Sequence, residues 1–172
     1  MTDTQKIGAG VVVGSPGWEQ KLAQNKQDFV LSWISRPEFL AAHPLSQTAD
    51  QFVDSLFQNN GVTPTAAERA TAMTLFGAGD AAGRAAALKS VAESQSVNQK
   101  QFNPAFVLMQ YFGYLRRNPD DAPDNNFNGY QFWLDKLNQF NGNFVQAEMV
   151  KAFLTSLEYQ QRFGPTTFDL SQ

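Results

Sequence analysis

A residue pattern between Phe106 and Tyr159 constrains the fold of this chain more than any other feature, because parts of it recur upstream. Its opening element, Phe106-Val107-x-x-Gln110-Tyr111, resembles Phe52-Val53-x-x-Leu56-Phe57. Its closing element, Phe153-x-x-Ser156-x-Glu158-Tyr159, has two counterparts, Trp33-x-x-Arg36-x-Glu38-Phe39 and Val91-x-x-Ser94-x-Ser96-Val97. Recurrence of this kind is typical of helical repeats, in which neighbouring copies bury each other's apolar faces.

Helical spacing and helix-start signals occur along most of the chain. Tyr130, Trp133, Leu134 and Leu137 follow the spacing of one helix face. Thr65 and Glu68 have the spacing of a capping box, and Asn103-Pro104 is typical of a helix start. A last long helix is expected over about 144–162, and no segment alternates as a strand does. The sequence therefore predicts an all-α protein, a compact bundle of about seven helices built from two degenerate helical repeats.

These signals divide the chain into five segments. Residues 1–15 are rich in Gly and Val without periodicity, so we expect an N-terminal arm. A lead-in helix and turn should follow. The expected boundaries are 1–15 for the arm, 16–47 for the lead-in helix and turn, 48–102 for a degenerate helical repeat, 103–164 for a clear helical repeat, and 165–172 for a C-terminal tail.

Composition argues against several classes of function. The net charge is −3 and Arg116-Arg117 is the longest basic run, so no nucleic-acid partner is expected. Apolar runs are too short for membrane insertion. The chain has no cysteine and one histidine, His43, and we expect no enzyme. Asn and Gln together are as numerous as all charged residues. Such amides suit hydrogen bonding to sugars or sister subunits, although a solvated surface would also explain them.

The pattern resembles a bacterial family, the domain of unknown function 4214. That family has F-V-x-x-L-Y, then L-G-R-x-P-D, then D-x-x-G-x-x-Y-W-x-x-x-L, then S-x-E-F/Y. The positions that match are Phe106, Val107, Tyr111, Leu115, Arg117, Pro119, Asp120, Gly129, Trp133, Leu137, Ser156, Glu158 and Tyr159. Departures include Arg116 in place of Gly and an insertion after Asp120. The helical pattern is also similar to phycobilisome linker domains. The resemblance implies a non-catalytic binding or assembly module and supplies no catalytic residues.

Six of the matching positions are expected to have structural roles. An arginine at a helix end can pair with a carboxylate, and for Arg117 the candidates are Asp120 and Glu158. Pro119 would turn the chain and Trp133 would bury a wide apolar face. The expected structural set is Arg117, Pro119, Gly129, Trp133, Ser156 and Glu158.

The inserted loop offers a chemical hypothesis. Asp124, Asn126 and Asn128 before Gly129 match the first half of a calcium loop, and Asp120 adds another carboxylate. These four oxygen-bearing residues are candidate calcium ligands, calcium being the one cofactor that the sequence suggests. The alternative is that Asn126 or Asn128 caps a helix starting near Gly129.

Two aromatic residues beside this loop suggest a second hypothesis. Phe127 and Tyr130 could stack on sugar rings, although aromatic residues at helix starts often belong to a core instead.

The expected function is that of a non-enzymatic interaction or assembly module from a secreted or cell-surface bacterial protein. Any export signal would lie outside these 172 residues. A protein partner or a sister subunit is expected, and a glycan is a further candidate. The alternatives are a calcium-dependent glycan-binding domain centred on residues 120–129 and a self-assembling structural subunit.

Overall fold

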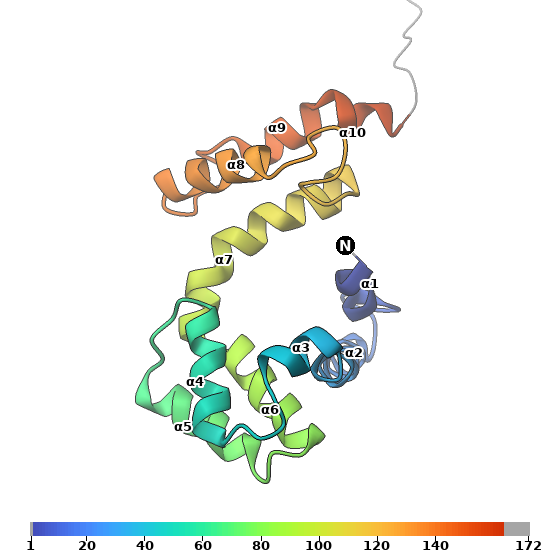
Figure 1. Ribbon diagram of the computed structural model, residues 1–172. Helices are drawn as coiled ribbons and strands as arrows, with labels where there is room; N and C mark the ends of the chain where they lie inside the picture. The colour runs from blue at the N-terminus through green and yellow to red at the C-terminus, as the bar shows by residue number, and fades with distance from the viewer. Residues whose placement is uncertain (1, 164–172) are drawn as a thin grey trace, which may run out of the picture. The chain divides into compact units, whose positions relative to one another are not determined.

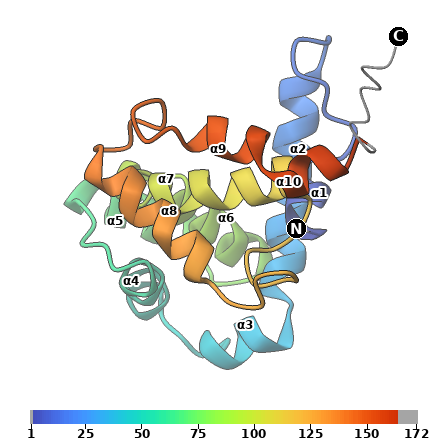
Figure 2. The same cartoon turned by 90° about the horizontal axis from the view of Figure 1, so that it is seen from above.

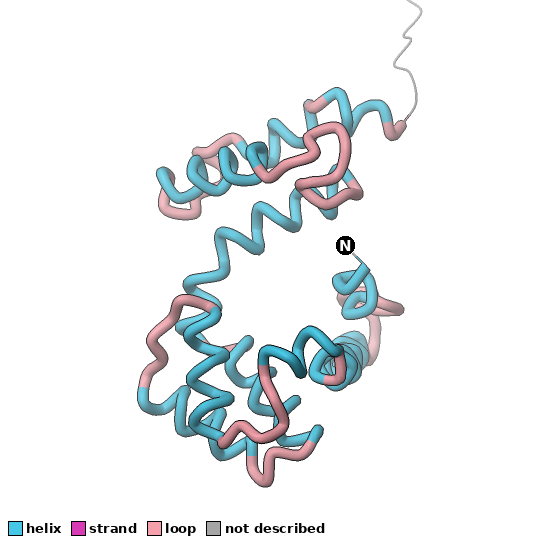
Figure 3. The backbone as a smooth tube through the Cα atoms, viewed as in Figure 1, coloured by secondary structure: helices cyan, strands magenta, loops and turns pink. Residues whose placement is uncertain are grey.

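A computed structural model describes residues 2–163, which form helices joined by turns and loops, with no strand among them (Figures 1 and 3). The prediction of an all-α protein is confirmed. Ten α-helices and one π-helical turn occur in this range: α1 Thr2–Gly8, α2 Trp18–Ile34, α3 Pro37–Ala42, α4 Ala49–Asn59, α5 Ala66–Phe76, α6 Ala81–Ala92, α7 Gln95–Gln110, η1 Tyr111–Leu115, α8 Asn128–Gln139, α9 Met149–Thr155 and α10 Leu157–Gln161. The expected tail at 165–172 lies outside the described residues.

The chain divides into two compact units between residues 101 and 102. We call residues 2–101 the N-terminal unit and residues 102–163 the C-terminal unit. The division falls one residue before the expected boundary between the repeats at 102 and 103. The arm and the lead-in helix are part of the same compact unit as the upstream repeat.

Part of the expected N-terminal arm at 1–15 is helical although its sequence has no helical periodicity, because residues 2–8 form helix α1, which packs against α2. Arg36 donates to both carboxylate oxygens of Asp3, at 3.0 and 2.9 Å. The Asn25 side chain donates to the backbone carbonyls of Ile7 and Ala9. These partners lie far along the chain, so a short segment of low periodicity becomes helical through tertiary contacts.

Helices α4, α5 and α6 contain most of the core of the N-terminal unit. Two of them begin with complete capping boxes, Thr48 with Gln51 on α4 and Thr65 with Glu68 on α5, and the second was predicted. The buried core side chains are Phe52, Val53, Leu56, Phe57, Ala72, Phe76, Ala87, Val91 and Val97. Because Gly83 has no side chain, the start of α6 lies against the backbone of Phe76 at the end of α5.

The guanidinium of Arg84 is buried in this core, and no carboxylate among the described residues pairs with it. Arg84 is fully enclosed, donates to the carbonyl of His43, and lies over the Phe52 ring with 4.3 Å between its Cζ and the ring centroid. Its Nη1 has no hydrogen-bond partner among the described residues. Burial, followed by the charge of Arg84, lowers the pKa of His43 below its usual value. The core therefore favours the neutral form of His43, the only histidine of the chain, whose ring contacts the Ser55 hydroxyl.

The C-terminal unit consists of the second part of α7, η1, and helices α8, α9 and α10. Helices α8 and α9 lie on the same side of the C-terminal part of α7 (Figures 1 and 2). The buried core side chains are Val107, Tyr111, Phe112, Leu137, Ala147, Met149 and Phe153.

Each of the three recurring closing elements is a break between two helices. Arg36 and Ser156 have extended backbone between α2 and α3 and between α9 and α10. The hydroxyls of Ser94 and Ser156 accept the backbone N–H three residues later, at Val97 and Tyr159, so each serine starts a new helix.

These breaks correct three expectations. The segment 144–162 is a turn followed by two short helices, because Ser156 interrupts it. Helix α7 begins at Gln95 and passes through Pro104, so Asn103-Pro104 does not start it. Pro37 lies at the first turn of α3, a helix that the expected lead-in helix and turn at 16–47 did not include.

We expect the protein to become more stable when Arg116 is replaced by glycine. Its backbone is left-handed, with φ 61°, at the position where the family pattern has Gly. Gly61, three residues before Pro64 as Arg116 is before Pro119, has the same φ of 61°. Arg116→Gly should therefore raise the free energy of unfolding by about 1 kcal/mol. Urea denaturation would measure this, with Arg116→Ala as the control that removes the side chain but keeps the strained Cβ. Equal stability of the two variants would contradict the prediction.

Candidate functional site

The most strongly connected side chain of the C-terminal unit is Arg117, which follows η1 at the start of the inserted loop. Its Nε lies 2.6 Å from Glu158 Oε1 and its Nη2 lies 3.0 Å from Glu158 Oε2. The same Nη2 donates to Asp124 Oδ2 at 2.6 Å. Planar, two-point pairing of this kind is the strongest form of guanidinium–carboxylate contact. Arg117 thus joins the inserted loop to the first turn of α10.

The remaining donor group of Arg117 anchors the loop backbone. Its Nη1 donates to the carbonyl oxygens of Asn118, Pro119 and Asp121, at 3.1 to 3.3 Å. Pro119 is buried where the chain turns. Hydrogen bonds to Glu158, together with those to Asp124, raise the pKa of Arg117 above its usual value. Every nitrogen of the guanidinium is therefore used within the protein.

One of the two expected partners of Arg117 is confirmed and the other is wrong. Glu158 pairs with it across 41 positions of sequence, but the second carboxylate is Asp124, and Asp120 is exposed. The path of the loop decides which acid reaches the guanidinium, and spacing alone gives no signal of that path.

A pocket of about 260 Å³ opens beside this cluster. Five of the six residues expected to be structural line it, namely Arg117, Gly129, Trp133, Ser156 and Glu158. Asp124, one of the candidate calcium ligands, also lines it. The lining is completed by Tyr111, Leu115, Ala152 and Phe153, to which no sequence signal assigned a role in a site.

The hydroxyl of Tyr111 lies at the pocket beside Gly129, the second residue of α8. A Cβ at position 129 would lie 2.7 Å from this hydroxyl, so the absence of a side chain there makes room for it. Tyr111 is only 3% exposed, yet its hydroxyl takes part in none of the hydrogen bonds found among residues 2–163. Burial, and after it the charge of Asp124, raises the pKa of Tyr111. The hydroxyl therefore remains protonated at neutral pH and is able to donate.

The four candidate calcium ligands do not share a centre. Asp124 pairs with Arg117, and Asp120 is exposed. The Asn126 side chain bonds locally, accepting from the backbone N–H of Asn128 and donating to the carbonyl of Asp124. Asn128 is the first residue of α8. Within residues 2–163, no three His, Cys, Asp or Glu side chains are grouped as metal ligands would be.

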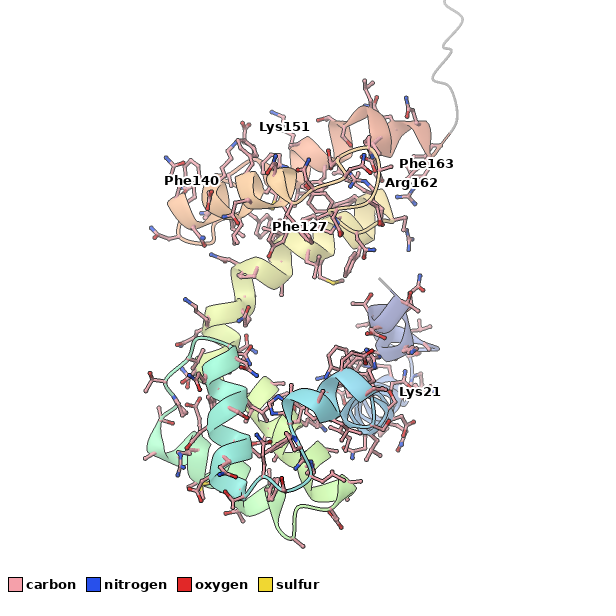
Figure 4. All side chains as sticks on the ribbon, viewed as in Figure 1. Lys21, Phe127, Phe140, Lys151, Arg162 and Phe163 are labelled. Carbon is pink, nitrogen blue, oxygen red and sulfur yellow. The ribbon has the colours of Figure 1, made fainter. Side chains whose placement is uncertain are left out.

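The two candidate sugar-stacking residues lie at the start of α8. The Phe127 side chain is exposed (Figure 4). Its ring meets that of Tyr130 edge-on, with 6.1 Å between the ring centroids. The Tyr130 hydroxyl donates to the carbonyl of Pro104 and its ring is half-buried, so Tyr130 serves the packing of α8 on α7. Phe127 is the one of the pair that remains open to a ligand.

The N-terminal unit contains a connection equivalent to the pair of Arg117 and Glu158. Glu68, at the start of α5, accepts from the backbone N–H and hydroxyl of Ser96, the residue that matches Glu158 in the repeat. These bonds, led by the backbone N–H of Ser96, lower the pKa of Glu68 to about 2. In both units, then, a polar contact holds the last helix break against an earlier segment of the unit.

A larger hollow of about 630 Å³ lies on the N-terminal unit among side chains of α2, α5 and α6. Among its polar side chains, Glu68 bonds to Ser96, and Ser94 bonds to Val91 and Val97. The pocket beside Arg117 brings together an ion-paired cluster and the Tyr111 hydroxyl, which has no partner in the described part of the chain, and we therefore take it as the candidate site.

Comparisons with models of protein families, with curated proteins and with solved structures found no match. The class of the protein therefore follows from its fold, that of an all-α protein with recurring helix breaks. Membership of the domain of unknown function 4214 family stays a prediction. Among the described residues, no helix combines the length and apolar character needed to cross a membrane.

Proposed function

We propose that this chain is a non-enzymatic assembly module whose partner is a second copy of itself. The observation that carries the proposal is a row of three phenyl rings on the C-terminal unit. Phe102 stacks on Phe106 with 6.3 Å between ring centroids, and Phe106 stacks on Phe144 at 5.1 Å. We call Phe102, Phe106 and Phe144 the phenyl ladder. Its outer rings are 56% and 41% exposed, and the adjacent Val145 is 69% exposed.

The backbone under the phenyl ladder is well held. Asn103 donates to the side chain of Asn138, which connects the middle of α7 to α8. The Asn143 side chain accepts from the N–H groups of Val145 and Gln146 and shapes the turn that carries Phe144. A surface held in this way loses little entropy when it binds, which favours association.

The residues around the phenyl ladder explain why the partner would be a second copy. Asn103 and Asn143 are next to Phe102 and Phe144 in sequence, and they bond to Asn138 and to the backbone of Gln146. All four residues are neutral amides, which both donate and accept hydrogen bonds. Two copies related by a two-fold axis would bring the same surface of each copy together, and neutral amides at that surface would not repel each other. Exposed phenyl rings together with neutral amides form a self-complementary surface.

Sedimentation velocity across a wide concentration range tests the proposal. We expect the wild-type chain to dimerise and Phe102→Ser/Phe144→Ser to raise the dissociation constant at least about tenfold, because two stacked rings are lost from the contact. Phe132→Ser is the matched control, since Phe132 is similarly exposed on α8 outside the phenyl ladder. A monomeric wild type, or a double variant that dimerises as well as the wild type, would refute the proposal.

Location at the cell surface or outside the cell is part of the same proposal. Its support is the resemblance of 106–159 to the domain of unknown function 4214, which is typical of large secreted or surface proteins. Fractionation of the producing bacterium with an antibody against this chain tests it. Signal confined to the cytosol would contradict the location without bearing on dimerisation.

A calcium-dependent glycan-binding domain remains the alternative, favoured by the exposed Phe127 beside the carboxylates of the inserted loop. If calcium binds, it should raise the melting temperature over that in EDTA, because a ligand of the folded state stabilises it. Equal melting temperatures in EDTA and in excess calcium would eliminate this alternative.

A further inference from the structure

We propose that the pocket bounded by Tyr111, Asp124, Trp133 and Glu158 binds a single neutral sugar ring and does so without a metal ion. This is a different site from the phenyl ladder and does not depend on dimerisation. The pocket lies entirely within the C-terminal unit, between η1, α8, and the break between α9 and α10. The indole of Trp133 lies 5.7 Å from the ring of Phe153, so one wall of the pocket is aromatic. Aromatic walls receive the C–H face of a sugar ring, which is apolar.

Two carboxylates, those of Asp124 and Glu158, also line the pocket, and Arg117 holds both of them in place. Glu158 receives two bonds from the guanidinium and Asp124 receives one. A carboxylate has about four acceptor sites, so each retains room for a further donor. Asp124 Oδ1 accepts none of the hydrogen bonds found among the described residues. Sugar hydroxyls are the donors that these fixed acceptors would receive.

The third polar group is the Tyr111 hydroxyl, which belongs to a residue of the pocket lining and has no protein partner within residues 2–163. Because none of these residues occupies it, this hydroxyl is available to pair with a ligand in the pocket. It can donate to a ring oxygen or a sugar hydroxyl while accepting from another. A sugar presents both kinds of group on adjacent carbons, so it matches an arrangement of two acceptors beside one donor.

The size and charge of the pocket favour a neutral ligand. A volume of about 260 Å³ lies just under the range for drug-sized ligands, which suits one ring. Asp124 and Glu158 together would repel an anion. A cation would lie against Arg117, whose guanidinium carries the opposing positive charge between the two acids. A neutral polyol meets neither repulsion.

A two-dimensional NMR titration of the labelled chain with methyl glycosides of glucose, galactose and mannose tests the proposal, in buffer with EDTA. We expect saturable shifts of the Trp133 indole for at least one glycoside. Tyr111→Phe should weaken that binding about tenfold, because it removes one hydrogen bond and leaves the ring packing intact. Tyr159→Phe is the matched control, because Tyr159 lies in the same unit outside the pocket and should bind as the wild type does.

Four outcomes would overturn the proposal, three of them in EDTA. These are the absence of saturable shifts with any of the glycosides, equal binding by Tyr111→Phe and the wild type, and tighter binding of methylammonium than of every glycoside. Binding that appears only when calcium replaces EDTA would also overturn it, in favour of the calcium-dependent alternative. The phenyl-ladder double variant should bind the glycoside normally, so loss of dimerisation and loss of sugar binding are separately measurable.

Discussion

Arg117→Ala should lower the free energy of unfolding of the C-terminal unit by about 3 kcal/mol, as breaking a largely buried ion pair does. The side chain is 11% exposed and accounts for the only ion pairs found for Asp124 and Glu158 within residues 2–163. Its loss also leaves three loop carbonyls without that donor. Both acids are about one-third exposed, so water solvates them when Arg117 is lost. The expected loss of stability therefore lies at the lower end of the range for buried ion pairs.

Hydrogen exchange followed by mass spectrometry measures the effect separately in each unit. Amides of α8, α9 and α10 should exchange faster in Arg117→Ala, while those of α4, α5 and α6 provide an internal reference. Arg69→Ala is the matched control. Arg69 also binds two acids, Asp50 and Asp54, but it is 35% exposed and its loss should have a much smaller effect. Comparable losses for the two arginines would show that the Arg117 cluster is not a stabilising centre.

Gly83→Ala should destabilise the N-terminal unit to a similar degree, by about 3 kcal/mol, through overpacking. An added Cβ would lie 2.1 Å from the carbonyl oxygen of Phe76 and 2.9 Å from its carbonyl carbon. Both are backbone atoms, so relief requires α5 and α6 to move apart. These two helices share the most extensive contact in the unit.

Gly113→Ala, in another helix, should stabilise the protein where Gly83→Ala destabilises it. Gly113 lies in η1 with no heavy atom within 4 Å of an added Cβ, so helix propensity alone should raise stability by about 0.5–1 kcal/mol. Urea denaturation of both variants gives the comparison. If Gly83→Ala were as stable as the wild type, the close approach of α6 to Phe76 would be wrong.

Local signals in the sequence predicted the helices well where the chain itself supplies the cap. The capping box of Thr65 and Glu68 starts α5 as predicted, because both members lie within one turn. Helix α1 was missed because its contacts come from Asn25 and Arg36, which are distant in sequence. The break at Ser156 was missed although the repeat pointed to that residue. Nothing in local spacing distinguishes a serine inside a helix from one that starts a new helix.

The sequence predicted which residues belong to the candidate site better than it predicted how they are paired. Arg117, Gly129, Trp133, Ser156 and Glu158 were selected as structural residues, and all line one pocket. Two features of the pocket had no sequence signal. The ion pair with Asp124 depends on the path of the inserted loop. The free hydroxyl of Tyr111 depends on the space left by Gly129, which only the packing of α8 against η1 reveals.

The two units differ most in the loop that begins at Pro64 in one and Pro119 in the other. The next helix starts at Ala66 in the first and only at Asn128 in the second. The Arg117 side chain donates to the backbone carbonyls of Asn118, Pro119 and Asp121, near the base of the longer loop, and so holds that base in place. The exposed residues 125–127 thus extend from a fixed base. Foreign peptides could be grafted at this point for display, with the helices serving as an unchanged frame.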